Sequence, residues 1–171
     1  MQAWPFFPSR ASKDAERLLL QVTNISRNPA LFGEGRVPDT LDGRFELVGL
    51  YAALALVRLR QAPEAEPLAQ AFVDALFRYF DSGLREDGVG DLAVPKRVHM
   101  LASAFYGRAD AYAAAFADAN TLQAVLTRNV LAGRPAFAEA LARYVQTLAD
   151  AQSKSNWQTL LLPEGWTAFV A

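Results

Sequence analysis

Apolar residues recur at helical rather than alternating spacing along almost the whole chain, with abundant Ala and Leu and few β-branched clusters. Side chains three and four positions apart share one face of an α-helix, whereas a strand alternates with a period of two. The pattern therefore predicts an all-α protein. We expect a single domain over residues 1–171, with residues 1–11 as an N-terminal segment that can be flexible. It should be a bundle of about six to eight helices around a central apolar helix.

Capping residues and helix breakers divide the chain into these helices. Ser, Thr, Asp and Asn cap a first turn, and Pro and Gly begin or end a helix. The first predicted helix begins near Ser12, its cap, and ends before Asn28-Pro29, and the second begins at an Asp39 or Thr40 cap and ends at about Arg60. The third runs from Pro67 to Gly83 or Gly88, and the fourth runs from Pro95 to Gly107, which is expected to be a left-handed cap. Three further helices are predicted: a short one through Tyr112 and Phe116, one from an Asn120 cap to Gly133, and one from Pro135 through Leu148.

The helix that ends near Arg60 is predicted to form the centre of the bundle. Its residues from Leu47 to Val57 are almost all apolar, which indicates burial on every side. This run is too short for the roughly 20 residues that a membrane-spanning helix needs. Before it, residues 32–38 contain two glycines and a proline, which indicates an ordered loop or a mobile lid. After the last helix, residues 157–166 are too apolar for a solvated linker.

Composition excludes several functional classes. The chain has no cysteine, so it has no disulfide, no thiol nucleophile and no cysteine-based metal site. It has 17 Lys and Arg against 18 Asp and Glu, so no overall field favours nucleic acid or an anionic membrane. We therefore expect no specific nucleic-acid recognition, and any binding of a charged surface must be local.

The N-terminal residues 1–8 lack the basic and continuous apolar regions of a secretory signal, which predicts that the chain is not exported. Trp4, Phe6 and Phe7 are expected to pack on the protein's own body or to fray, although a membrane interface or a partner groove is an alternative.

Catalytic and phosphate-binding patterns are weak. His99 is the only histidine, and with no nucleophile motif beside it we interpret it as a surface or boundary residue. The segment Gly88-Val-Gly-Asp91 is similar to a fragment of a phosphate loop, but it lacks a third glycine and a preceding strand. We interpret it as a turn between helices.

Three carboxylates, Asp39, Asp42 and Glu46, fall within about two turns of one predicted helix start. Such a group could hold a divalent cation or a basic partner. Acidic residues also stabilise a helix N-terminus, so we favour capping together with an ion pair to Arg44 or Lys96.

A second charged group surrounds the helix that begins at Pro95. Lys96, Arg97 and Arg108, together with Arg85, could form a basic patch for phosphate, a lipid headgroup or an acidic peptide, or simply a solvated face. The inner face of this helix is expected to be Val98, Leu101, Ala102 and Phe105. Tyr106, about 100° further round the helix, is the better interface candidate.

These two charged segments match motifs of a known family. The first reads Asp39-Thr-Leu-Asp-Gly-Arg-Phe-Glu46. The second reads Leu84-Arg-Glu-Asp-Gly-Val-Gly-Asp-Leu-Ala-Val-Pro-Lys-Arg-Val98 and is followed by Ala104-Phe-Tyr-Gly-Arg108. In them the chain resembles the ubiquinol-cytochrome c chaperone family, over residues 38–145. It departs from the family pattern at Asp87, where a methionine is usual, and at Pro95.

The resemblance implies an all-helical, non-enzymatic assembly factor without a cofactor, which helps newly made cytochrome b or another membrane-protein client to mature into the cytochrome bc1 complex. In mitochondrial members this involves a partner protein and contact with the ribosome. The chain lacks an Arg- and Ser-rich leader and is more similar to the bacterial members. This implies a cytoplasmic location, with the inner face of the cytoplasmic membrane as a peripheral alternative.

Three hypotheses follow for the charged residues. In the first, a chaperone recognition surface is formed by Asp39, Asp42, Arg44, Glu46, Arg85, Asp91, Lys96, Arg97, Tyr106 and Arg108. In the second, a small all-α enzyme or carrier holds a phosphorylated or isoprenoid ligand near Asp39/Asp42 and Lys96/Arg97. In the third, the two motifs brace the fold by joining Asp91 or Glu46 to arginines on other helices.

Overall fold

Six α-helices form the body of the protein. The structure, a computed structural model, describes residues 9–170, and this part contains no β-strand, which confirms the all-α prediction. The elements are α1 (Arg10–Ser26), α2 (Leu41–Arg60), α3 (Glu66–Glu86), α4 (Val94–Ala115), α5 (Ala119–Asn129) and α6 (Ala138–Lys154), with 3₁₀ turns at Pro29–Leu31, Pro63–Ala65, Pro135–Phe137, Trp157–Leu161 and Pro163–Gly165. The interpretation of Trp4, Phe6 and Phe7 lies outside the described residues.

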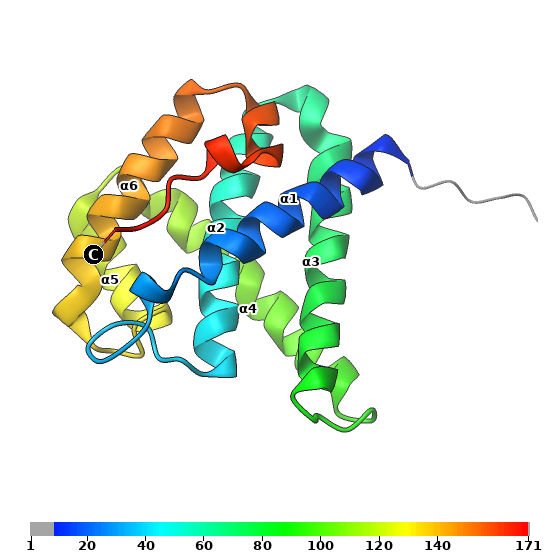
Figure 1. Ribbon diagram of the computed structural model, residues 1–171, viewed down its shortest axis with the longest axis horizontal. Helices are drawn as coiled ribbons and strands as arrows, with labels where there is room; N and C mark the ends of the chain where they lie inside the picture. Colours follow the sequence, from blue (N-terminus) through cyan, green and yellow to red (C-terminus); the bar gives the residue numbers. More distant parts are fainter. Residues whose placement is uncertain (1–8, 171) are drawn as a thin grey trace, which may run out of the picture.

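Helix α2 is the central element, as predicted. It lies behind α1 in Figure 1 and contacts α1, α3, α4 and α6. Leu47, Val48, Leu50, Ala52 and Ala53 point in different directions around the helix, and all are buried. Because successive side chains are about 100° apart, no face of α2 is left for water over residues 50–56, all of which are buried. The other helices are therefore arranged around it.

Three helix starts differ from the sequence expectations or refine them. Thr40 caps α2, and its side chain accepts a hydrogen bond from the Gly43 N–H at 3.1 Å, as expected. The cap of α1 is Ser9 rather than Ser12: the Ser9 hydroxyl accepts from the Ser12 N–H, so Arg10 and Ala11 already belong to the helix. Asp118, not Asn120, caps α5 through the Thr121 N–H at 2.8 Å.

Gly107 does not end a helix, which contradicts the sequence prediction. Helix α4 runs through it to Ala115, so Tyr112 belongs to α4 and not to a separate short helix. Phe105, Ala109 and Tyr112 are buried at helical spacing on both sides of Gly107. An interior glycine costs roughly 1 kcal/mol relative to alanine, which is less than the burial of these side chains contributes. Tertiary packing therefore outweighs the local preference.

The other breakers act nearly as predicted. Helix α3 continues through Gly83 and ends at Glu86, and Gly88 follows with a positive φ of 83°. Helix α5 ends at Asn129, short of Gly133. Pro135 opens a 3₁₀ turn before α6 rather than α6 itself.

The tail packs onto the body, as its apolar character predicted. Leu160 is fully buried, and Trp166 is 7% exposed, with its indole N–H donating to the Leu160 carbonyl at 2.9 Å. None of the helices in residues 9–170 is long and apolar enough to cross a bilayer.

Substitution of two glycines by alanine should have opposite effects. A Cβ atom at Gly43 would lie 2.1 Å from the Pro38 carbonyl oxygen, so Gly43→Ala should lower the free energy of unfolding by about 1–3 kcal/mol. Gly107 is exposed in mid-helix with open space around it, so Gly107→Ala should raise the free energy of unfolding by up to about 1 kcal/mol. Urea denaturation measures both values, and a destabilised Gly107→Ala would contradict the continuous α4.

Candidate functional site

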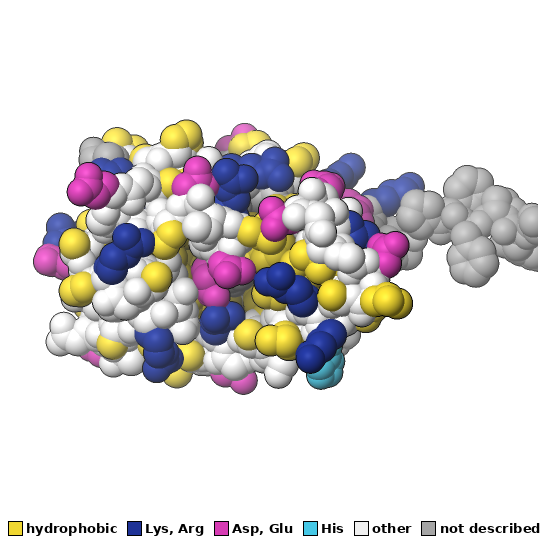
Figure 2. Space-filling model, turned by 90° about the horizontal axis from the view of Figure 1, so that it is seen from below, with side chains coloured by type: hydrophobic (Ala, Val, Ile, Leu, Met, Phe, Trp, Pro, Cys, Tyr) yellow, Lys and Arg dark blue, Asp and Glu magenta, His cyan; other side chains and the backbone are white. Residues whose placement is uncertain are grey.

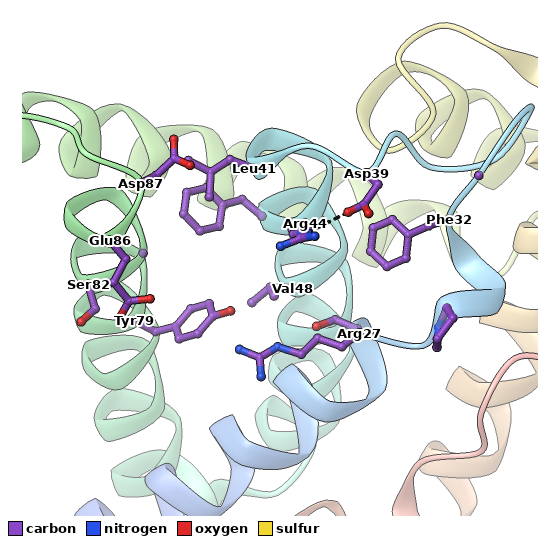
Figure 3. A pocket seen from close by; sticks show the side chains of 15 residues that line it. Arg27, Phe32, Asp39, Leu41, Arg44, Val48, Tyr79, Ser82, Glu86 and Asp87 are labelled. Atoms are coloured by element: carbon purple, nitrogen blue, oxygen red, sulfur yellow. Dashed lines mark hydrogen bonds and ion pairs between the residues drawn. The ribbon is translucent and has the colours of Figure 1, made fainter.

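A groove of about 940 Å³ lies between α1, α2 and α3. We call it the large groove. Figure 3 shows it from close by, with α3 on one side, the end of α1 and the chain after it on the other, and α2 behind. Its lining residues are Ser26, Arg27, Pro29, Phe32, Gly33, Asp39, Leu41, Arg44, Phe45, Val48, Tyr79, Ser82, Gly83, Glu86 and Asp87.

The loop of residues 32–38 forms one end of the large groove, and it is ordered. Phe32 and Val37 pair in an isolated β-bridge, and Val37 is fully buried. Arg36 fixes the loop from outside: its guanidinium donates to the Ala30 carbonyl and stands over the Phe137 ring, 5.3 Å from the ring centre. These contacts hold Phe32 at the groove.

The charges on the two sides of the large groove differ. Glu86 and Asp87 lie at the end of α3, whereas Arg27 directly follows α1 and Arg44 lies on α2. Arg44 donates to Asp39 at 2.8 Å, and both side chains are more than half exposed. Arg27 and Tyr79 extend into the groove from opposite sides in Figure 3. The groove thus combines an apolar floor with an acidic and a predominantly basic edge.

A second, smaller cavity of about 290 Å³ lies between α2, α3 and α4, and we call it the small cavity. Phe45 borders both hollows. Its ring packs against Phe80 at 5.0 Å, and α3 can approach it closely because residue 83 is glycine: a Cβ there would lie 3.1 Å from the Phe45 ring. The remaining lining residues are Asp42, Glu46, Leu84, Arg97, Met100, Leu101, Ala104 and Arg108.

An ion pair between Glu46 and Arg108 joins α2 to α4 beside the small cavity. The nitrogen-to-oxygen distance is 2.7 Å, and the Glu46 side chain is only 18% exposed. Burial disfavours the charged carboxylate, and this effect is larger than the opposing attraction of Arg108; the negative charge of Asp42 adds to it. The pKa of Glu46 is therefore raised to about 7.

Comparison with known proteins identifies the family. The sequence profile described as Ubiquinol-cytochrome C chaperone matches residues 34–161, which include all of α2, α3, α4, α5 and α6. The chain belongs to the ubiquinol-cytochrome c chaperone family. The crystal structure of the Cbp3 homolog from Brucella abortus is similar to this chaperone, with 35% sequence identity and a TM-score of 0.76 over 95% of this chain and 93% of that one. No curated protein matches the chain.

The structure brings the first family motif of this chaperone to both hollows. Asp39 and Arg44 form the expected ion pair at the large groove. Asp42 instead borders the small cavity with Arg97, and neither it nor Lys96 forms an ion pair within residues 9–170. The Asp39/Asp42 pair of the ligand-carrier hypothesis is therefore divided between two sites.

Part of the second motif of the chaperone forms ion pairs within the protein itself. Arg85 pairs with Asp81 and Asp91 around the turn that follows α3, and Glu46 with Arg108 gives the brace that the third hypothesis describes. Gly88-Val-Gly-Asp91 is a turn, as interpreted, and His99 is exposed. Phe105 is buried, whereas Tyr106 is 46% exposed against Phe77. Whether these residues bind a partner stays a prediction.

Sequence reasoning did not identify Arg27, Phe32 and Tyr79 as site residues of the chaperone, although all three line the large groove. They lie on three different segments, and none of them belongs to a recognisable motif. Tyr79 is half-buried on α3 next to the buried Phe80, and the sequence does not distinguish it from the core residues of that helix.

The raised pKa of Glu46 predicts a pH-dependent stability of the chaperone. Its ordinary pKa is 4.5, so the folded protein holds this proton more tightly than the unfolded chain does. The free energy of unfolding should therefore fall as the pH rises from about 5 to about 7, with a contribution from Glu46 of about 1–3 kcal/mol. Glu46→Gln should remove this contribution, as measured by urea denaturation at several pH values.

The matched control is Glu139→Gln. Glu139 also pairs with an arginine, Arg143, but its side chain is 71% exposed. This variant should keep the wild-type pH dependence. An unchanged slope in Glu46→Gln would show that the carboxyl group does not titrate in this range.

Proposed function

We propose that this protein is a non-enzymatic chaperone that holds newly made cytochrome b during assembly of the bc1 complex. The observation that carries this proposal is the family match over residues 34–161, which covers most of the residues lining the large groove. Its client would be a membrane protein, whose segments are apolar helices before they are packed. We therefore also propose that the chaperone acts in the cytoplasm at the inner face of the membrane.

The shape of the large groove supports binding of a helical segment. One turn of an α-helix, 10–12 Å across and 5.4 Å high, occupies roughly 400–600 Å³. The groove of about 940 Å³ therefore has room for roughly two turns. Helix-in-groove binding uses apolar anchors at positions three and four apart, and such anchors need an apolar floor.

Phe32, Leu41, Phe45 and Val48 provide that floor. Phe32 and Leu41 are half-buried, so they remain accessible to a client, whereas Phe45 and Val48 are already buried in the protein. The polar edges, Arg27 and Arg44 opposite Glu86 and Asp87, would favour one direction of the client helix, because a helix carries partial charges of opposite sign at its two ends.

Photocrosslinking in the native cell tests this function. A photoreactive amino acid in place of Phe32 or Tyr79 should crosslink to cytochrome b, because both side chains line the large groove. The double variant Phe32→Ala/Leu41→Ala should weaken client binding at least about ten-fold, since truncated apolar anchors dominate interface energies. It should also reduce the assembled bc1 complex in a strain that carries no wild-type copy.

The control position is Leu162, which is 52% exposed on the tail and does not line the large groove. The same photoreactive group there should give no crosslink to cytochrome b, and Leu162→Ala should support normal assembly. Normal levels of bc1 complex in a deletion strain would contradict the assembly role. Normal assembly by the double variant would contradict the large groove as the client site.

A further inference from the structure

The connection between α3 and α4 presents an unusual surface. In Figure 1 it projects from the end of the two helices at the lower edge of the molecule. Leu92, in this connection, is 100% exposed, and Met100, in the second turn of α4, is 60% exposed. Large apolar side chains fully in water are unfavourable, and a group of them marks an interaction surface rather than a solvated one.

Cationic side chains surround these two apolar residues. Lys96 and Met100 are one turn apart on the outer face of α4, and Arg97 and His99 are exposed beside them. Neither Lys96 nor Arg97 forms an ion pair within residues 9–170. Arg108, further along α4, differs from them because it is paired with Glu46. In Figure 2, which shows the molecule from below, the single histidine lies at the edge of the protein next to a Lys or Arg side chain, with hydrophobic side chains nearby.

The acidic residues of the same connection do not neutralise this surface. Asp91 is paired with Arg85, and Glu86 and Asp87 line the large groove on the other side. In this region the charges are thus segregated: these carboxylates face the large groove or an arginine, whereas Lys96 and Arg97 on α4 form no ion pair within residues 9–170. Arg97 and Met100 also line the small cavity, together with Asp42 of α2. This arrangement is complementary to an anionic surface.

We propose that Leu92, Lys96, Arg97, His99 and Met100 form a surface that binds an anionic lipid bilayer. Leu92 and Met100 enter the headgroup region, while Lys96 and Arg97 contact lipid phosphates. A projecting, convex segment suits a broad deformable surface, whereas a helical partner would need a groove. The bilayer-binding surface does not depend on the proposed client, but it would place the acidic edge of the large groove beside the membrane.

Vesicle co-sedimentation with the purified full-length protein tests the proposal. The protein should bind vesicles of phosphatidylcholine with phosphatidylglycerol, bind pure phosphatidylcholine much less, and dissociate at high salt. Lys96→Glu/Arg97→Glu should weaken binding at least about 25-fold, at about 5-fold for each cation lost. Leu92→Ser/Met100→Ser should weaken it about ten-fold. All four side chains are exposed, so the free energy of unfolding should stay at the wild-type value.

Leu162→Ser and Lys13→Glu are the matched controls, because both side chains are exposed on other segments. They should bind vesicles as the wild type does, and so should the groove variant Phe32→Ala/Leu41→Ala. Absence of wild-type binding to the anionic vesicles, or undiminished binding by the Lys96/Arg97 and Leu92/Met100 variants, would overturn the proposal. Neither result would affect the crosslinks that test the large groove.

Discussion

Burial of α2 on every side is the constraint on which the other features depend. Leu47, Val48 and Leu56 point in different directions and are all buried, and each large apolar side chain contributes about 1.5–3 kcal/mol when removed from water. Helices α1, α3, α4 and α6 must therefore all reach α2, and they cannot do so equally well along its whole length. Where they diverge near the N-terminal turns of α2, the large groove and the small cavity remain beside it.

The charged residues at this end of α2 have two different physical roles. The pair of Asp39 and Arg44 is exposed, so water and salt screen it and it contributes little to stability. The pair of Glu46 and Arg108 is partly buried, and its desolvation outweighs its attraction, as the raised pKa of Glu46 shows. An apolar pair could hold α2 against α4 at lower cost, so this ion pair adds little to the stability of the fold.

The sequence was sufficient to predict the helical class, the central helix, a cap of that helix at Asp39 or Thr40, and the packing of the tail. These follow from periodicity and from local hydrogen bonds that involve neighbouring residues. The limits of α1 could not be settled in this way, because Ser9 and Ser12 are both good caps one turn apart. The continuity of α4 through Gly107 depends on side chains that meet other helices, and a local preference of about 1 kcal/mol cannot reveal them.

The candidate site, like the fold, could be predicted from the sequence only in part. The two motifs were predicted to form a recognition surface, and the structure shows that both border the two hollows. Their role in binding stays a prediction. Arg27, Phe32 and Tyr79 could not be assigned, because the groove that they line exists only after α1 has packed against α3. The sequence also placed Asp39 and Asp42 together, since a helical turn separates them, but Asp39 lies before the helix and its side chain follows a different direction.

Phe45 has a consequence for the relation between the two hollows. Its ring is a common wall that packs against Phe80 of α3, and the absence of a side chain at Gly83 leaves room for it. A molecule that enters the large groove and displaces this ring changes the volume of the small cavity, and with it the surroundings of Glu46. Binding on one side of the ring would then alter proton affinity on the other, and thermodynamic linkage requires the effect to be reciprocal.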